Sequence, residues 1–384
     1  MEWSLAGVAR SRGRRNVQGS RGFTYRLAAA SAAKRTPPRN PKHNQDYWNY
    51  TSTQKSTNPP YLRSTKPASG EDAFFATTLD SSEHHVAFGV ADGVGGWQDQ
   101  GIDPSDFSHG LCGLMAGTAY LHSVEESGML RPQALLQTAY DAVIANPRIL
   151  AGGSTACLAV LDQDGTMESA NLGDSAFLVF GPGKVAYKSE VQTHAFNTPF
   201  QMAKVPPKMM AQYAIFGGEG GGKHFSEVPR QAEVVKQRVK HGDVVVVATD
   251  GVWDNLSAQD ALGIITRVMV EHKYWVNGDK ETLLDAAHIA ALPTSLSGSK
   301  EHEEYLPGLI ATAVMREAKA AGLDRRRDGP FAKEVMAKYP GEGWEGGKPD
   351  DIAVVVCIAV DGNVKGGAQA AGGGGDEKPL KAKL

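Results

Sequence analysis

The stretch VAFGVADGVGGW, residues 86–97, shows how this chain folds. Its apolar part has the composition of a short buried strand, and it follows the apolar run AFFATTL (73–79) after a polar break at residues 81–85. Two such runs on either side of a polar break indicate an antiparallel hairpin. Asp92 then falls where a buried strand ends and a glycine-rich turn begins. We expect the strand to hold this carboxylate rigidly.

Three other short stretches place acids in the same kind of setting. GEDAFF (70–75), ATDGVWDN (248–255) and GKPDDIAVVV (347–356) each set Asp beside glycine or another acid, next to apolar residues. Like charges gathered in such places would repel one another and cost stability. Mg²⁺ and Mn²⁺ prefer oxygen ligands and would remove that cost. The pattern indicates a metal-dependent hydrolase, although Asp-Gly pairs are also common in ordinary turns.

The order of the expected elements favours antiparallel sheets. Strands come first, then helical periodicity over 104–145, then many short strands, then helices at 257–292 and 303–321, and a last strand at 351–360. This is not the regular alternation of a doubly wound parallel sheet, and it suits sheets with helices segregated outside. We expect the last strand to pair with an early strand near 72–92, which would bring the acids to one edge.

Composition narrows the class further. The chain has 384 residues with 41% hydrophobic content, enough for one large domain or two small ones. The net charge of −3 gives no global basic field for binding nucleic acid, and no apolar run is long enough to span a membrane. We expect a monomer. The three cysteines lie far apart without C-x-x-C spacing, which favours reduced structural thiols over a disulfide framework or a zinc site.

The N-terminal region differs from the rest in charge. Residues 1–45 contain ten Lys and Arg but one acid, Glu2. This is the composition of a mitochondrial transit peptide, although a disordered basic tail has the same composition. We therefore expect residues 1–45 to lie outside the fold and 46–69 to be a linker. The catalytic domain is expected to cover 70–361, followed by a low-complexity, disordered tail at 362–384.

Six motifs in order resemble the metal-dependent protein phosphatase family, type 2C. They are ED (71–72), ADGVGGW (91–97), GGSTAC (152–157), NLGDS (171–175), ATDGVWDN (248–255) and PDDIAVVV (349–356). The likeness is greatest to the mitochondrial branch, whose members carry DGVGGW and NTPFQ, here residues 197–201. The resemblance covers residues 70–360. It implies an α+β fold, a four-layer α-β-β-α sandwich with two central, mostly antiparallel sheets flanked by helices.

The resemblance also implies which residues hold two Mg²⁺ or Mn²⁺ ions and a third, weaker one. The expected metal ligands are Asp72, acting largely through water, Asp92 bridging both ions, the Gly93 carbonyl, Asp250, Asp350, and Asp174 at the third ion. Asp92 and Asp250 are the expected catalytic residues. Asp351 is more often Asn in the wider family, and we expect it to orient its neighbour. Asp254 is expected to be a helix N-cap rather than a ligand.

The function implied is a protein serine/threonine phosphatase acting on phosphorylated proteins in mitochondria, within the matrix. The two ions lower the pKa of a shared water, which attacks phosphorus in line without a phosphoenzyme. Two departures from the wider family stand out. Val94 replaces a His proposed to protonate the leaving oxygen, and the stretch 62–72 has no clear match to a phosphate-binding Arg, so Arg63 or Lys66 would have to serve. These departures motivate one alternative, a catalytically silent binding protein that retains the fold. A second alternative is a small-molecule phosphatase with the same metal centre.

Overall fold

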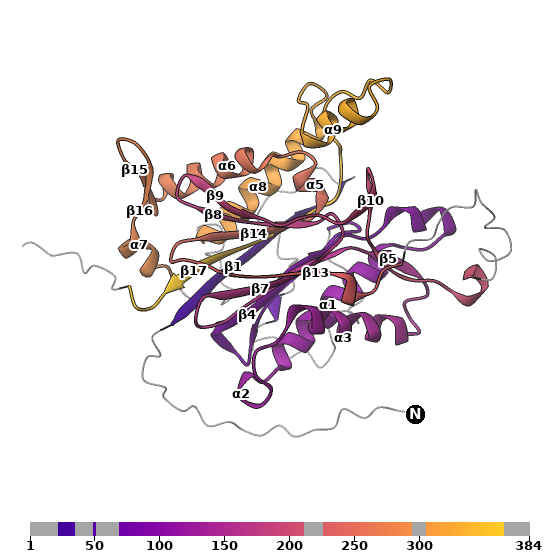
Figure 1. Ribbon diagram of the computed structural model, residues 1–384, viewed down its shortest axis with the longest axis horizontal. Helices are drawn as coiled ribbons and strands as arrows, with labels where there is room; N and C mark the ends of the chain where they lie inside the picture. Colours follow the sequence, from indigo (N-terminus) through magenta and orange to yellow (C-terminus); the bar gives the residue numbers. More distant parts are fainter. Residues whose placement is uncertain (1–21, 35–48, 51–68, 211–225, 294–304, 365–384) are drawn as a thin grey trace, which may run out of the picture.

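The computed structural model describes residues 22–34, 49–50, 69–210, 226–293 and 305–364. Two β-sheets face each other in the middle of the molecule, and helices cover the outer face of each sheet, as Figure 1 shows. The expected four-layer α-β-β-α sandwich of the α+β class is therefore confirmed. No helix in these described ranges is long and apolar enough to cross a membrane.

The first sheet has five strands in the spatial order β1-β17-β14-β8-β9. Each neighbouring pair is antiparallel. Its strands are β1 (Phe23–Ala32), β8 (Ala176–Gly181), β9 (Lys184–Lys188), β14 (Val244–Ala248) and β17 (Ile352–Asp361). Since β17 is the second strand from one edge and β14 the third, the acids that follow β14 and precede β17 lie on neighbouring strands.

The second sheet has six strands in the order β13-β7-β6-β4-β3-β2. Its pairs are antiparallel except for β2, which runs parallel to β3. The strands are β2 (Asn49–Tyr50), β3 (Ala73–Leu79), β4 (Ser82–Ala91), β6 (Ala156–Leu161), β7 (Thr166–Leu172) and β13 (Glu233–Arg238). The expected hairpin over 73–91 is thus present as β3 and β4.

The core has three layers because the central strands are buried on both faces. Along β17, Val355 and Cys357 point into the space between the sheets, whereas Val354 and Val356 point outward under the helices. This alternation follows from the two-residue period of a strand. Each fully buried Val, Leu or Phe contributes roughly 1.5–3 kcal/mol to stability. All three cysteines are buried and free.

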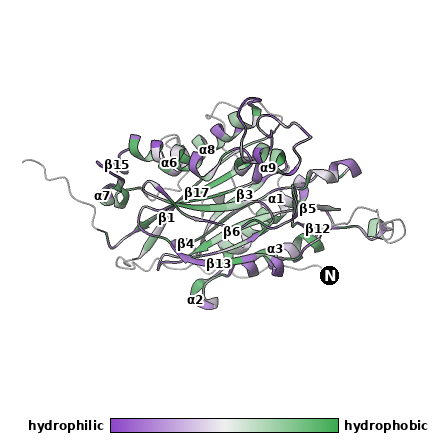
Figure 2. Ribbon diagram, turned by 45° about the horizontal axis from the view of Figure 1, so that its top comes forward, coloured by the Kyte–Doolittle hydropathy of each residue, from purple (hydrophilic) through white to green (hydrophobic). Residues whose placement is uncertain are grey.

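Helices close the two outer faces. Over the second sheet lie α1 (Ser105–Leu121) and α3 (Pro132–Ala145), and over the first sheet lie α5 (Asp250–Trp253), α6 (Ala258–Glu271) and α8 (Leu306–Leu323). Pro132 starts α3, as the sequence indicates, and Ser257 caps α6 in a capping box with Asp260. Figure 2 colours the central strands largely as hydrophobic, whereas hydrophilic residues gather at the periphery.

The remaining elements are short and lie at the ends of the sandwich. They are α2 (Val124–Ser127), α7 (Ala286–Ala290), α9 (Pro330–Lys338), the 3₁₀ helices Gly95–Gln100 and Pro229–Gln231, and the strands β5 (Gly152–Ser154), β10 (Thr193–Ala195), β11 (Thr198–Pro199), β12 (Met202–Lys204), β15 (Trp275–Asn277) and β16 (Thr282–Leu284). We call residues 191–204, which include β10 to β12, the flap.

The expectation that residues 1–45 lie outside the fold is wrong for Phe23–Ala32. This segment is β1, which pairs with β17 over its whole length, from Phe23 with Asp361 to Ala32 with Ile352. Tyr25 and Leu27 are buried between the sheets, and even Arg26 is buried, where its Nε donates to Leu292 O at 3.2 Å. The basic composition of residues 1–45 did not indicate a buried strand. An arginine can nevertheless be buried when a carbonyl accepts its hydrogen bond. The folded domain therefore begins before Gly70, and β2 lies within the expected linker.

The pairing expected for the last strand is also wrong. β17 pairs with β1 and β14, and it faces β3 and β4 across the core between the sheets instead of joining them. The strand that fills the edge beside β17 is β1, which the charge of residues 1–45 had removed from consideration. The acids still meet, because β4, β14 and the loop before β17 reach the same end of the two stacked sheets.

Candidate metal centre

Asp92 lies directly after β4 and is fixed through its backbone. Its carbonyl oxygen accepts from the Thr155 N–H at 3.0 Å and from Ser154 Oγ at 2.8 Å, and its own N–H donates to Thr155 Oγ1 at 3.3 Å. The next residue must be glycine, since a Cβ at Gly93 would lie 2.7 Å from the Glu71 carbonyl oxygen. The DG and GGST motifs thus act together to hold the Asp92 carboxylate in place.

Asp72 lies just before β3 and is almost fully buried, with 2% of its surface exposed. Its Oδ2 accepts a hydrogen bond from Thr249 Oγ1 at 2.7 Å. Thr249 belongs to the ATDG motif of the other sheet, and it is also the N-cap of α5. This bond therefore joins the first acid motif to the third, about 180 residues later in the chain.

Asp250 is the first residue of α5 and follows β14 directly. A side chain at Gly251 would collide with the carbonyl oxygen of Asp351, so the chain must have glycine there for the loop before β17 to pass. Burial, followed by repulsion from Asp250, raises the pKa of Asp92, so the two carboxyl groups lie near each other. The two expected catalytic acids therefore meet across the two sheets.

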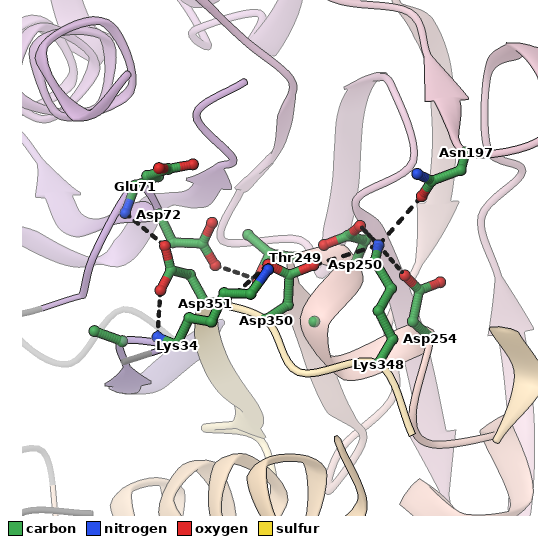
Figure 3. A network of polar contacts seen from close by, with 12 residues as sticks. Lys34, Glu71, Asp72, Asn197, Thr249, Asp250, Asp254, Lys348, Asp350 and Asp351 are labelled. Carbon is green, nitrogen blue, oxygen red and sulfur yellow. Dashed lines mark hydrogen bonds and ion pairs between the residues drawn. The ribbon is translucent and has the colours of Figure 1, made fainter. Parts of the chain in front are cut away.

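Asp350 and Asp351 precede β17 and connect three segments (Figure 3). Asp351 accepts from the Glu71 N–H at 2.8 Å and from the Lys34 N–H, so its carboxylate joins the turn before β3 to the end of β1. Asp350 extends toward the other acids, and Lys34 Nζ lies 3.5 Å from its Oδ1. These contacts are compatible with the expectation that Asp351 orients its neighbour and is not itself a metal ligand.

Lys348 stands on the other side of Asp350. Its Nζ lies 2.8 Å from Asp250 Oδ2, 2.6 Å from Asp254 Oδ2 and 3.3 Å from Asp350 Oδ2. It also donates to Asn197 Oδ1 in the flap at 3.2 Å. Figure 3 shows the ammonium surrounded by these four side chains. It serves as a counter-ion to three carboxylates.

The carboxyl groups differ in electrostatic environment. Burial raises the pKa of Asp92 and of Asp72 well above the usual range, and neighbouring aspartates raise both further. Burial also acts to raise the pKa of Asp250, but the Lys348 ammonium and hydrogen bonds outweigh it, and the net shift is downward. Asp250, Asp254 and Asp350 keep the Lys348 pKa above its usual value despite burial. Burial, followed by repulsion from Asp250, also raises the pKa of Asp254 and of Asp350, so the ammonium lowers the net pKa of Asp250 but not that of its two neighbours.

Asp174 lies in the turn between β7 and β8, where Gly173 adopts a φ of +115°. Its Oδ1 is buried and has no hydrogen-bond partner among the residues that the structure describes. Burial, followed by repulsion from Asp250, raises the pKa of Asp174 to about 7. An unpartnered buried carboxylate oxygen is costly, and a cation is one group that would satisfy it. Its placement is compatible with the weaker third ion expected there.

The carboxylate oxygens gathered here are the kind of ligand atom that a divalent-metal centre needs. Each of the expected acids Asp72, Asp92, Asp250, Asp350 and Asp174 has a pKa that at least one of the others affects. Oxygen donors of this kind suit Mg²⁺ and Mn²⁺. Within the described ranges, however, no three Asp, Glu, His or Cys side chains already form a ligand set around one point. Around Asp250 and Asp350 the central position is taken by Lys348, so the assignment of ligands stays a prediction.

Several residues at the site were not expected, and one expectation is wrong. Asp254 is not an N-cap: it follows the last residue of α5, Ser257 caps the next helix, and the Asp254 carboxylate joins the acidic cluster through Lys348. Lys348 could have been noticed from the sequence, since it precedes the acids in GKPDD. No sequence motif points to Lys34 or Asn197, because only the folding of the chain brings these two residues near the acids. Arg63 and Lys66 lie outside the described residues.

Comparison with known proteins identifies the class. No family model matches the chain. It is 32% identical over 295 residues to "Protein phosphatase PTC7 homolog" of Homo sapiens, covering 76% of this chain and 80% of that protein. It is 29% identical over 300 residues to "Protein phosphatase 2C homolog 7, mitochondrial" of Saccharomyces cerevisiae, covering 78% of this chain and 76% of that protein. The chain therefore belongs to the type 2C protein phosphatase family, as its motifs indicate.

Within that family, the relatives named here are PTC7 homologues, in agreement with the branch that the DGVGGW motif indicates. Among solved structures, the X-ray structure of the photosystem II phosphatase PBCP is similar to this chain with a TM-score of 0.52 and 23% sequence identity. The match covers 75% of this chain and 91% of that chain. It supports the fold.

Proposed function

We propose that this chain is a Mg²⁺- or Mn²⁺-dependent protein phosphatase that hydrolyses phosphoserine and phosphothreonine in proteins. The observation that carries the proposal is the meeting of Asp72 and Asp92 from one sheet with Asp250 and Asp350 from the other. Buried acids at such a junction repel one another unless cations are bound. Membership of the type 2C phosphatase family supports phosphate hydrolysis as the reaction at this cluster.

In this proposal, Asp92, the Gly93 carbonyl, Asp250 and Asp350 would hold two divalent ions, with Asp72 at their margin and Asp174 toward a third. When bound, the ions would lower the pKa of a water molecule and offset charge on the phosphoryl group. The chain's own residues fix the positions of these donors: Ser154 and Thr155 hold Asp92, and Thr249 holds Asp72. Such rigid placement is what a hydrolytic centre needs.

Protonation of the leaving alkoxide is not assigned to Val94. Its side chain packs beside Trp97, Ala151 and Ala203, and its N–H donates to the Gly153 carbonyl at 3.0 Å. Val94 therefore packs against residues beside the flap, and its side chain has no proton to donate. We therefore propose that a water molecule supplies the proton to the departing serine or threonine oxygen.

The test uses the full-length chain, because β1 belongs to the fold. Release of phosphate from phosphoserine and phosphothreonine peptides is measured with Mn²⁺, with Mg²⁺ and with excess EDTA. We expect activity with either ion and none in EDTA. Activity that persists in EDTA would refute the metal mechanism. Turnover of small phosphate esters without turnover of phosphopeptides would favour a small-molecule phosphatase, and metal binding without any turnover would favour a silent binding protein.

Mitochondrial location is proposed on two grounds. The yeast relative carries the word mitochondrial in its name, and residues 1–21 contain five arginines and one acid. These residues lie outside the described part of the chain. We expect the full chain with a C-terminal fluorescent tag to colocalise with a matrix marker, and the same protein without residues 1–21 to remain in the cytosol. Identical mitochondrial signals from both proteins would contradict a targeting role for residues 1–21.

A further inference from the structure

Lys348 makes an unusual set of contacts for a lysine beside a metal centre. Three carboxylate oxygens and one amide oxygen surround its Nζ at 2.6–3.3 Å, from Asp254, Asp250, Asn197 and Asp350 (Figure 3). Its side chain is 15% exposed. An ammonium usually finds one such partner at a protein surface, and solvent competes with it there. Here a single ammonium contacts four oxygen acceptors from three separate segments.

The backbone of Lys348 is fixed, so the ammonium is tethered. Its N–H donates to Asn255 Oδ1 at 2.9 Å, and its carbonyl accepts from Asn255 Nδ2 at 2.8 Å. The Nζ also lies 5.0 Å from the centre of the Phe331 ring in α9. A flexible four-carbon side chain on a fixed backbone can move its charge by several ångströms without unfolding anything. The aromatic face of Phe331 already lies within cation–π distance, so it can keep contact with the ammonium when the carboxylate contacts are lost.

We propose that Lys348 is a built-in competitor of the divalent ion at the Asp250 and Asp350 side of the centre. Its ammonium neutralises these acids while no metal is bound, and it must leave them when an ion binds. Metal affinity is therefore set partly by a residue of the chain that is not a ligand. This inference rests on the proposed metal-dependent function, and it adds a determinant of how tightly the metal is held.

Competition follows from the chemistry of the donors. Asp250 and Asp350 are the acids expected to bind the second ion, and the Asp250 Oδ2 and Asp350 Oδ2 atoms already face the ammonium. A divalent ion needs several oxygen atoms close to it, so it and the ammonium cannot occupy the same position. Two positive groups side by side in a partly buried site would also repel each other. Binding of the ion thus requires breaking the Lys348 contacts.

The same displacement would reach the flap. Asn197, at the turn between β10 and β11, touches the ammonium through Oδ1. The neighbouring Phe196 ring lies 5.2 Å from the Phe331 ring, centre to centre, so the flap and α9 meet beside Lys348. When Lys348 leaves the acids, the flap loses its polar contact with the centre but keeps the aromatic one. We therefore expect hydrogen exchange in residues 193–199 to be faster with Mn²⁺ than in EDTA.

The direct test measures Mn²⁺ binding by calorimetry, independently of activity. Lys348→Met keeps the length of the side chain and removes the charge. We expect it to bind Mn²⁺ about tenfold or more tightly than the wild type, because no competitor has to be displaced. The matched control is Lys34→Met: Lys34 Nζ lies 3.5 Å from Asp350 Oδ1 but is 49% exposed and lies on the far side of that carboxylate. We expect a change of less than about threefold, as for other exposed charges.

Three results would overturn the inference. Unchanged or weaker Mn²⁺ affinity in Lys348→Met would show that the ammonium does not compete. An equal increase in Mn²⁺ affinity in both variants would show that the effect comes from removing any nearby positive charge. Unchanged flap exchange would refute the link through Asn197. A wild-type protein that binds no Mn²⁺ at all would instead contradict the proposed metal-dependent function, so the two failures are distinguishable.

A measurement on the wild-type protein covers the case in which Lys348→Met does not fold. Lysines are acetylated briefly in EDTA and in Mn²⁺, and the extent of labelling at each site is read by mass spectrometry. We expect labelling of Lys348 to rise severalfold with Mn²⁺, while Lys236, an exposed lysine on the edge strand β13, stays constant as an internal reference. Labelling of Lys348 that stays the same or falls with Mn²⁺ would overturn the proposal.

Discussion

The two sheets bring their acids to the centre with different partners. The second sheet supplies Asp72 and Asp92, and within the described part of the chain neither of them pairs with a Lys, Arg or His side chain. The first sheet supplies Asp250 and Asp350, which contact Lys348, and Asp350 also faces Lys34. The pKa of Asp92 is raised well above the usual range, by burial first, whereas that of Asp250 is lowered. Asp350 lies between these cases: burial, followed by repulsion from Asp250, raises its pKa despite the two lysines.

This difference indicates which half of the centre is stable without metal. Asp250 of the first sheet has a counter-ion in Lys348 that outweighs its burial, so it tolerates the loss of a divalent ion. The acids of the second sheet depend on protonation or on a bound cation to lower their electrostatic cost. The two halves also differ in assembly, because the first sheet depends on β1 from the N-terminal region. Each experiment below tests one side of this contrast.

Removal of β1 should have the largest effect. Deletion of residues 1–34 removes the strand paired with β17, the buried Tyr25 and Leu27, and Lys34. Two buried side chains of this size contribute roughly 3–6 kcal/mol, comparable with the net stability of many domains. We expect an aggregated or non-cooperatively melting protein, whereas deletion of residues 1–21 leaves the melting temperature within a few degrees. Circular dichroism melts and soluble yield measure this. A cooperative melt equal to that of the full chain would show that β1 is dispensable.

The next contrast compares Asp92→Asn with Asp250→Asn. Both should lower turnover with Mn²⁺ by about a thousandfold or more, since each removes an expected metal ligand. In EDTA their stabilities should diverge. Asp92→Asn removes a charge that costs energy and should raise the melting temperature, whereas Asp250→Asn deprives Lys348 of a partner and should lower stability by about 1–3 kcal/mol.

Asp164→Asn serves as the control for both variants, because Asp164 is an exposed acid in the turn between β6 and β7. It should leave turnover and stability unchanged. If the two site variants shift stability in EDTA in the same direction, the contrast between the sheets is wrong. Near-normal turnover in both would refute their assignment as catalytic residues.

How much of this could be predicted from the sequence depends on whether a signal is local. Asp92 and Asp250 were identifiable because each follows an apolar strand and precedes glycine, and the capping of α6 and the start of α3 are equally local. The partner of β17 could not be identified from the sequence, because the packing of the whole sandwich determines which strand lies beside it. β1 was missed because its alanines and its one arginine match a targeting sequence as well as a strand that packs closely under α8.

The pH dependence of the metal-free protein provides a further contrast. Burial, together with Asp250, raises the pKa of Asp174 to about 7, and burial raises those of Asp72 and Asp92 as well. Between about pH 4 and pH 7 the folded state therefore binds more protons than the unfolded chain, so stability falls as pH rises. In EDTA we expect the melting temperature to fall from pH 5 to pH 8, with a smaller slope in Mn²⁺.

Asp174→Asn should remove part of that slope, because the amide does not titrate. The effect should amount to a few kcal/mol at most by linkage. Urea unfolding at pH 5 and pH 8 in EDTA measures it. A melting temperature that rises with pH in EDTA would contradict the sign of the shifts. An unchanged slope in Asp174→Asn would mean that the other acids account for the dependence.

The smallest effect is expected at Asp351, which joins the two sheets. Its carboxylate accepts from the Lys34 N–H after β1 and from the Glu71 N–H before β3, with the latter at 2.8 Å. Asp351→Asn keeps one acceptor oxygen and turns an N–H donor toward the other amide, which should cost about 1 kcal/mol. The variant also removes a charge that helps to raise the pKa of Asp72, and this relief offsets part of the loss.

The net change in Asp351→Asn should therefore be within about 1 kcal/mol, with turnover reduced less than about tenfold. Asp351→Ala gives the same electrostatic relief but loses both hydrogen bonds, so it should be less stable than Asp351→Asn by about 1–2 kcal/mol. Urea unfolding of the three proteins in EDTA separates the two contributions. If both variants were equally stable, the backbone hydrogen bonds would not be what joins the sheets here, and repulsion among the acids alone would set the stability of this junction.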